Sequence, residues 1–444
     1  MSRPVMRLPL RRLFRPTTIP RTPLHNQQPP PRPRDPLPQA QGFHHHQRRH
    51  ASSFTSSART LFRQNPLSVS LAVLALLSGV AALAYTNYLY QYYILRAFHN
   101  YPEEVAKKLR RALYYTNTDL QPQEAIKYYR QALQIAAEIG MDPFSDEIIG
   151  VKIQVSKLME EVRQLGKAAQ VLEILRTDCL RWIEQLGGLE KNRTKRTRVL
   201  AKTVAISVKL GELYGSPEIY DRELAEERLV YAVETVLKER LRRQALRQAE
   251  GLSKEALDEK EGVWMSESEE GAALERLAAG YEEKGQHYLA SPLFLQALSL
   301  YPSKDCHAVV LMNNLASSLA QQSPRAANVV AAHAASTTLT DPSTSSPGAL
   351  ASAPPATRES MIQNAQLWAR KALSVAASIQ PPERTEECDI GCAVATHNLG
   401  EFAEMLGQRE EAKKLYGEAK ALARAIGFTE GVIQSEERLR SLGE

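Results

Sequence analysis

The segment CDIGC places Cys388 and Cys392 one helical turn apart, a spacing at which two thiols can act together. Such a pair could be oxidised, or it could supply half of a metal site. A metal site needs a second pair of Cys or His ligands at similar spacing, and no such pair follows nearby. The simpler interpretation is two partly buried thiols at the start of a helix. With Cys179 and Cys306, the four cysteines are too few and too scattered for a disulfide scaffold.

The other reactive side chains do not form a recognisable catalytic motif. The segment GELYGS lacks the lysine and the preceding strand of a phosphate-binding loop, and no Gly-x-Ser-x-Gly elbow occurs. Adjacent carboxylates such as Glu282 and Glu283 are typical of solvated helix surfaces. The histidines beyond the first fifty residues are dispersed: His99, His287, His307, His333 and His397. We therefore expect a chain that is not an enzyme and that binds neither a cofactor nor a metal.

Alanines recur in pairs seven residues apart, and a larger residue usually lies four residues after the first of them. Small residues allow two helices to cross closely, while large residues fill the grooves around the crossing. The pattern therefore predicts a series of helix pairs that touch at these alanines. The pairs are Ala125 and Ala132, Ala225 and Ala232, Ala290 and Ala297, Ala365 and Ala372, and Ala412 and Ala419.

A large residue followed by a small one precedes most of these alanine pairs, as expected for the first helix of each pair. The clearest copy spans residues 276–302, in which Tyr281 lies on the first helix and Phe294 on the second. Gly285 is suited to the left-handed conformation that ends a helix, and Pro302 closes the second helix. The large-then-small steps are Leu210–Gly211, Leu277–Ala278, Leu315–Ala316 and Leu399–Gly400.

This pattern resembles the tetratricopeptide repeat, a helix pair of about 34 residues. The resemblance covers about residues 104–440 in roughly six copies, and it implies an all-α superhelical solenoid that serves as a binding scaffold. Its expected divisions are degenerate helix pairs at 90–236, a charged insertion at 237–270, a better-preserved array at 271–427 that contains a disordered insertion at 323–358, and a capping helix at 428–444.

Two asparagines are the candidates for contact with a bound peptide. The segments MNNLA and THNLG place Asn314 and Asn398 directly before the repeat leucine. In some tetratricopeptide domains an asparagine at this point bonds the backbone of a bound peptide, because its amide offers both a donor and an acceptor. The resemblance implies that role here, and the alternative is a solvated or capping side chain. The basic residues that clamp a C-terminal carboxylate in chaperone-binding versions are not evident.

The first 63 residues contain twelve arginines and a single acidic residue, Asp35, although the rest of the chain is acidic on balance. An arginine-rich, acid-poor start is typical of a mitochondrial transit peptide, which we predict over residues 1–50 with a linker at 51–66. The histidine run His44–His46 is expected to be compositional. The segment lacks interleaved aromatic residues that would stack on bases, so we predict no nucleic-acid binding.

Residues 67–85 are uncharged over nineteen positions, and several tyrosines follow them. This length nearly matches the core of a bilayer, and tyrosines are typical of its interface, so we predict a transmembrane helix at 67–89. The positive-inside rule would leave the arginine-rich end in the matrix and the C-terminal array in the intermembrane space of the mitochondrial inner membrane. Exposure of that array to the matrix is the main alternative.

The whole layout resembles the fungal inner-membrane adaptor subunit of the i-AAA protease complex. The resemblance rests on the presequence, the single span, the segment YYILRAFHNYPEEVAKKLRRALYY and the repeat array that follows. It implies a membrane-anchored protein that captures unfolded or membrane substrates and assembles with the AAA protease and a second adaptor subunit. The alternatives are an assembly factor for a respiratory complex and, less well matched because of the presequence, an import receptor of the outer membrane.

Overall fold

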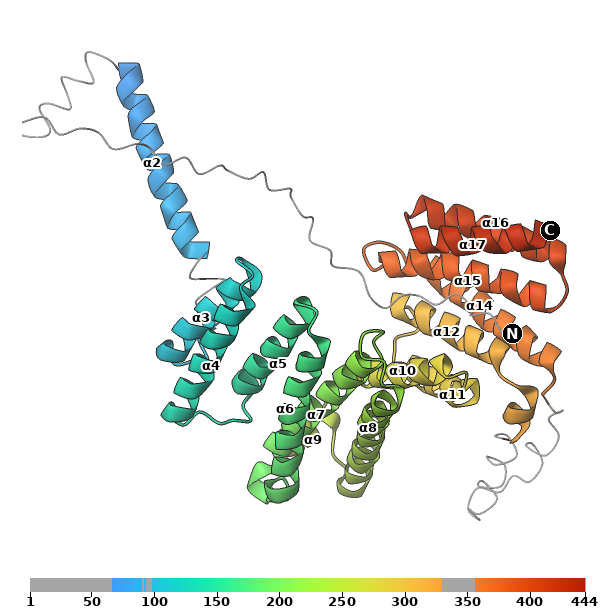
Figure 1. The fold of residues 1–444 in the computed structure, drawn as a ribbon, viewed down its shortest axis with the longest axis horizontal. Coiled ribbons are helices and arrows are strands. Elements are labelled where there is room, and N and C mark those ends of the chain that lie inside the picture. The colour runs from blue at the N-terminus through green and yellow to red at the C-terminus, as the bar shows by residue number, and fades with distance from the viewer. Residues whose placement is uncertain (1–65, 90–91, 93–97, 330–355, 444) are drawn as a thin grey trace, which may run out of the picture. The chain divides into compact units, whose positions relative to one another are not determined.

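The computed structural model describes residues 66–89, 92, 98–329 and 356–443 (Figure 1). The predicted transit peptide, all but the last residue of the linker and residues 330–355 of the second insertion lie outside the described residues. The described residues are helical and contain no strand. Their contacts divide the chain into two units, of which one contains α2 and the other runs from Lys107 to the C-terminus.

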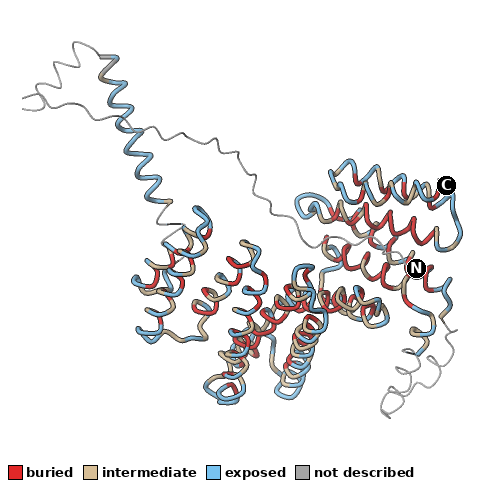
Figure 2. The backbone as a smooth tube through the Cα atoms, in the orientation of Figure 1, coloured by how far each residue is buried: buried red, intermediate tan, exposed pale blue. Residues whose placement is uncertain are grey.

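In the first unit, α2 spans Pro66–Leu89. Of the helices in the described residues, α2 is the one whose length and composition suit a membrane span, over Val69–Leu89. Most of α2 is exposed (Figure 2), and its exposed large apolar side chains include Leu71, Leu77 and Leu83. An exposed apolar surface of this kind is stable in lipid rather than in water.

From α3 onward, the described residues contain six helix pairs, a short helix (α9, Lys254–Glu261) between the third and fourth pairs, and a single helix at the end. The predicted all-α solenoid of helix pairs is thus confirmed, and successive helices pack against one another along the chain (Figure 1). The pairs are α3 (Glu103–Asn117) with α4 (Pro122–Ile139), α5 (Asp146–Glu161) with α6 (Leu165–Leu186), α7 (Arg193–Tyr214) with α8 (Arg222–Glu250), α10 (Glu267–Glu283) with α11 (His287–Leu298), α12 (Cys306–Gln321) with α14 (Arg358–Ser378), and α15 (Glu386–Met405) with α16 (Arg409–Ala425); α17 (Thr429–Gly443) follows.

The pair α10–α11 shows how local sequence sets the helix ends. Ser266 and Glu269 form a capping box in which each side chain accepts a hydrogen bond from the other residue's backbone N–H. At the other end of α10, Gly285 adopts a φ of +71°, which glycine tolerates without strain. The helix α11 ends at Leu298, four residues before Pro302, and Pro302 is exposed.

The small residues of the repeat pattern lie where helices touch. Ala278, Ala290 and Ala297 are fully buried in one core cluster together with Phe294, and Tyr281 packs against this cluster while half-buried. The other predicted packing residues are also buried: Ala125, Ala132, Gly211, Ala225, Ala232, Ala365, Ala372, Gly400, Ala412 and Ala419.

Two glycines mark close approaches between the two helices of a pair. A Cβ atom placed on Gly211 of α7 would lie 2.4 Å from Cγ of Leu229 on α8. A Cβ atom on Gly400 of α15 would lie 2.9 Å from the ring of Tyr416 on α16. Both partners are the large residues that lie between the paired alanines, so the large residue of one helix fills the space left by glycine on the other.

The structure defines the two predicted insertions in more detail. Over 237–270 the chain is largely helical, because α8 continues to Glu250 and α9 spans Lys254–Glu261, and α10 begins at Glu267. In the segment 323–358, residues 324–329 are helical and α14 begins at Arg358. Asn328 joins the two sides of that insertion, since its amide donates to the Ala356 carbonyl at 3.2 Å and accepts from the Ala356 N–H at 2.8 Å.

Ion pairs explain why the charged segment folds back onto the array. Arg243 of α8 is buried and donates to Glu239, to Asp258 of α9 and to the Gly262 carbonyl, at 2.7–3.0 Å. Arg242 joins Glu239 to Glu261 of α9. Each buried charge is therefore compensated, as burial requires. The sequence shows the charge but not which residues of α8 and α9 will meet.

Replacing Gly400 by alanine should lower the free energy of unfolding by about 1–2 kcal/mol, because the added methyl group meets the Tyr416 ring. The measurement is denaturant unfolding of the detergent-solubilised chain, followed by circular dichroism. Gly417→Ala on α16 is the matched control, because a Cβ atom there meets nothing within 4 Å. This control should be neutral or slightly stabilising, since alanine favours helix. Equal effects of the two substitutions would contradict the proposed close packing.

Candidate functional site

The candidate binding surface is formed by the first helices of the last three pairs, α10, α12 and α15, together with α17. We call it the first-helix surface. The helices α12 and α15 are buried along almost their whole length (Figure 2). Polar side chains nevertheless occur on each of them, and some of these side chains bond to the neighbouring first helix. These contacts fix the distances between neighbouring first helices.

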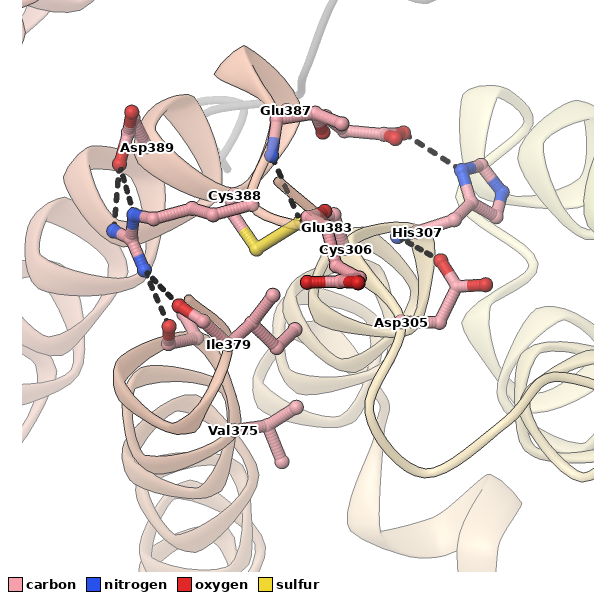
Figure 3. Close-up of a disulfide and its surroundings, with 12 residues drawn as sticks. Asp305, Cys306, His307, Val375, Ile379, Glu383, Glu387, Cys388 and Asp389 are labelled. Carbon is pink, nitrogen blue, oxygen red and sulfur yellow. Dashed lines mark hydrogen bonds and ion pairs between the residues drawn. A yellow bond between two sulfur atoms is a disulfide. The ribbon is translucent and has the colours of Figure 1, made fainter. Parts of the chain in front are cut away.

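His307 connects three successive first helices. Its Nε2 lies 2.8 Å from Glu275 of α10, and its Nδ1 lies 2.7 Å from Glu387 of α15 (Figure 3 shows the Glu387 side). Desolvation opposes the charged form, but hydrogen bonds and attraction to the two carboxylates outweigh it and raise the pKa of His307 to about 10. Both ring nitrogens therefore carry protons and donate, one to each carboxylate. The Tyr301 ring lies 4.9 Å from the imidazole and helps to cover it.

A disulfide joins Cys306 at the start of α12 to Cys388 near the start of α15 (Figure 3). Cys388 is therefore not the free thiol of the simpler sequence interpretation, which was wrong for this residue. Its partner is Cys306, 82 residues away, rather than Cys392, and a disulfide sulfur is not a thiolate ligand for a metal. Cys392 stays a free, half-buried thiol whose pKa is raised by burial. Among the described residues, no group of three or more Cys, His or carboxylate side chains is placed to hold a metal ion.

Arg384 holds the chain just before α15. Its guanidinium donates to Asp389 at 2.6 and 2.9 Å and also to the Ala376 carbonyl at the end of α14 (Figure 3). The disulfide, the Arg384 contacts and the His307 contacts all lie around the start of α15. This end of the first-helix surface is thus cross-linked by one covalent bond and by charged hydrogen bonds.

The two predicted peptide-binding asparagines are in different environments. Asn314 is half-buried on α12, whereas Asn398 on α15 is fully buried, and neither its Oδ1 nor its Nδ2 has a hydrogen-bond partner in the described part of the chain. The neighbouring Asn313 is also buried, and it donates to the Gly391 carbonyl at 2.9 Å. Peptide binding by Asn314 and Asn398 stays a prediction, and for Asn398 it requires that the covering helices give access.

Helix α17 makes polar contacts with α15, which is the first helix of the last pair. Ser435 lies 2.9 Å from Nδ1 of His397, and Arg438 donates to Glu401 at 2.9 Å. Burial lowers the pKa of His397 to about 3, with a further contribution from Arg438, so this histidine is neutral. Burial also raises the pKa of Glu401 to about 7, although Arg438 opposes the shift. The helix α17 thus gives the array a C-terminal cap, joined to α15 through polar contacts.

A cleft of about 800 Å³ lies beside this surface, between α8, α9 and α10. Its walls combine cationic, acidic and apolar side chains, and the Trp264 ring is among them. Arg243 lies with its guanidinium 5.9 Å from that ring. The lining also includes Arg240, Arg247, Lys254, Leu257, Met265 and Glu270. A mixed lining of this kind suits a peptide segment with an acidic and an apolar side chain.

Removing the disulfide should destabilise the C-terminal repeats by about 2–4 kcal/mol, because the open loop gains conformational entropy in the unfolded state. The test compares Cys306→Ser with the unmodified chain in thermal unfolding, with and without dithiothreitol. Reductant should lower the melting temperature of the unmodified chain and leave that of the variant unchanged. Cys392→Ser is the control and should retain the response to reductant. A response lost in both variants would point to a different pairing.

Replacing His307 by glutamine should destabilise the array by roughly 2–3 kcal/mol at pH 6.5, because Glu275 then stays buried without its cation. The sign with pH follows from the raised pKa: the contribution is complete below about pH 6.5 and is lost as pH rises toward 10. Urea unfolding at pH 6.5 and pH 8.5 should therefore show a smaller difference between the two proteins at the higher pH. A difference that does not change with pH would contradict a charged His307.

Sequence spacing alone does not reveal the His307 contacts, because His307 is 32 residues from Glu275 and 80 from Glu387. The positions of these residues in the helix pairs do indicate the contact. Cys306 and His307 begin one first helix, and Glu387 and Cys388 lie at the start of the next. Aligning the helix pairs would have placed these residues on neighbouring helices.

Comparison with known proteins finds a curated relative and similar solved structures. No protein-family model matches the chain. A curated relative from Schizosaccharomyces pombe, named as a TPR repeat-containing protein, is 26% identical over 343 residues, which are 76% of this chain and 77% of the relative. Two solved structures are similar in parts: BtubC from P. vanneervenii (13% identity, 70% of this chain, 93% of that chain, TM-score 0.42) and the TPR2AB domain of yeast Sti1 in complex with pHSP90 (13%, 77%, 98%, 0.22).

Proposed function

We propose that this repeat protein is a membrane-anchored adaptor that binds unfolded or membrane proteins and presents them to the i-AAA protease of the mitochondrial inner membrane. The observation that carries the proposal is the order of the parts: one helix suited to a membrane span, α2, precedes an array of tetratricopeptide-type helix pairs. Such arrays are scaffolds for protein–protein interaction. The choice of the i-AAA protease rests on the resemblance of the juxtamembrane segment and the overall layout.

The disulfide supports the orientation with the array in the intermembrane space. Disulfides persist in oxidising compartments and are rare where thiols are kept reduced. The bond between Cys306 and Cys388 lies within the array, on the C-terminal side of α2. An array in the matrix would meet reducing conditions and would lose this link between α12 and α15. The same orientation leaves the arginine-rich leader in the matrix, as the positive-inside rule favours.

Anchoring supplies the functional advantage in this mechanism. A chain held by α2 and a protease held in the same membrane meet at a high effective concentration, so weak capture of a client is sufficient. The cleft beside Trp264 offers cationic, acidic and apolar contact points. Weak binding at several points allows release of the client to the protease. A second adaptor subunit would complete the assembly.

The test is native affinity purification of the tagged full chain from mitochondrial membranes. We expect the AAA protease and a second adaptor subunit to be recovered, and we expect turnover of a misfolded intermembrane-space reporter to slow when the chain is removed. Recovery of a respiratory complex without the protease would instead favour the assembly-factor alternative. Recovery of neither, with an array that is still folded, would contradict the proposal.

The topology is tested separately by proteolysis of mitochondria. The C-terminal array should resist added protease in intact organelles and should be degraded once the outer membrane is ruptured. Protection that persists after rupture of the outer membrane would place the array in the matrix. Resistance of the chain to alkaline carbonate extraction checks that α2 is inserted.

A further inference from the structure

The first helix pair after α2 carries a cationic surface that the adaptor function does not use. It is formed by Lys107, Lys108 and Arg111 on α3 and by Lys127 and Arg130 on α4. Lys107, Arg111, Lys127 and Arg130 are exposed, and Lys108 is half-buried. We call this surface the α3–α4 cationic patch.

Aromatic rings bring the two halves of the patch together. The Tyr128 ring stacks on Tyr115 with centroids 5.7 Å apart and an interplanar angle of 4°. The cationic groups of Arg111 and Lys127 each lie 5.7 Å from the centroid of the same Tyr128 ring. Lys108 of α3 donates to Gln131 of α4 at 2.9 Å. One cation from each helix therefore lies at the same Tyr128 ring.

Most of these charges are not neutralised by the described chain. Lys127 pairs with Glu124 at 3.1 Å, on an exposed surface where such a pair contributes little. Lys107, Arg111 and Arg130 form no ion pair with any residue that the structure describes. The opposite side of α3 is apolar and buried, through Val105, Leu109 and Ala112. The patch is thus a solvated cationic face rather than part of an internal network.

The position of the patch along the chain points to its partner. Lys107 follows the last residue of α2, Leu89, by 18 positions, so even a fully extended connection would keep it within about 65 Å of that end of the helix. Clusters of Lys and Arg directly beside a membrane span bind anionic lipid headgroups, and tyrosines are favoured at the same depth. The tether to α2 also raises the effective concentration of lipid at the patch.

We infer that the α3–α4 cationic patch docks on anionic lipid headgroups of the bilayer that holds α2. This inference rests on the membrane anchoring in the proposed function. Docking would orient the first helix pair on the membrane surface and fix where the repeat array starts. The partner is the lipid surface, so the contact should depend on lipid charge and on salt.

The experiment uses the full chain in lipid nanodiscs made of phosphatidylcholine alone or of phosphatidylcholine mixed with phosphatidylserine. Lysine acetylation, read by mass spectrometry, reports the exposure of Lys107 and Lys127. We expect both lysines to be labelled about threefold more slowly in the anionic nanodiscs, and high salt should abolish the difference because it screens exposed charges. Lys414, exposed on α16, should be labelled equally in both lipids.

The variant Arg111→Gln/Arg130→Gln keeps the reporter lysines and removes two cations from the patch. It should lose at least half of the lipid-dependent protection. The matched control, Arg424→Gln/Arg440→Gln, removes the same charge from exposed positions on α16 and α17 and should retain the protection. Far-ultraviolet circular dichroism checks that both variants fold.

Two kinds of failure can be told apart. If α2 is inserted but labelling of Lys107 and Lys127 does not depend on lipid charge, the inference is overturned while the anchoring stands. A protein partner at this patch would give the same lipid-independent result. If carbonate extraction releases the chain from the bilayer, the anchoring itself fails and the inference fails with it.

Discussion

The array depends on how closely the two helices of each pair can approach. Where Gly211 faces Leu229 and Gly400 faces Tyr416, there is no room for a side chain on the first helix. Buried alanines such as Ala290 and Ala297 serve the same purpose in the clearest copy. Because each pair packs mainly on its neighbours, every crossing sets the position of the next pair. The polar contacts and the disulfide join helices whose positions these small residues set.

Polar contacts add specificity to the C-terminal part of the array. The imidazolium of His307 between Glu275 and Glu387, the disulfide of Cys306, and the α17 contacts through Arg438 each join different first helices. Apolar packing alone would tolerate small rotations of one helix against the next. Charged hydrogen bonds and a covalent bond have defined geometries, so they restrict these rotations. The first-helix surface is therefore more rigid than its apolar core requires.

The sequence predicted the helix pairs well because their signal is local and periodic. The alanine spacing, Gly285 and the step at Leu399–Gly400 are each readable within one helix pair. It did not predict the partner of Cys388 or the role of His307, since both depend on which helices become neighbours across 80 or more residues. It also could not show that Asn398 is buried, because burial depends on which helices pack against α15.

The hydrogen bonds between Asn328 and Ala356 bear on how the length of the chain can vary. The amide closes the base of the inserted segment with two hydrogen bonds, and the helices α12 and α14 on either side pack directly against each other. The entropic cost of a closed loop grows only with the logarithm of its length. Residues can therefore be gained or lost beyond this base at little thermodynamic cost. Homologous chains should differ most in length at this point, while the spacing from α12 to α14 is preserved.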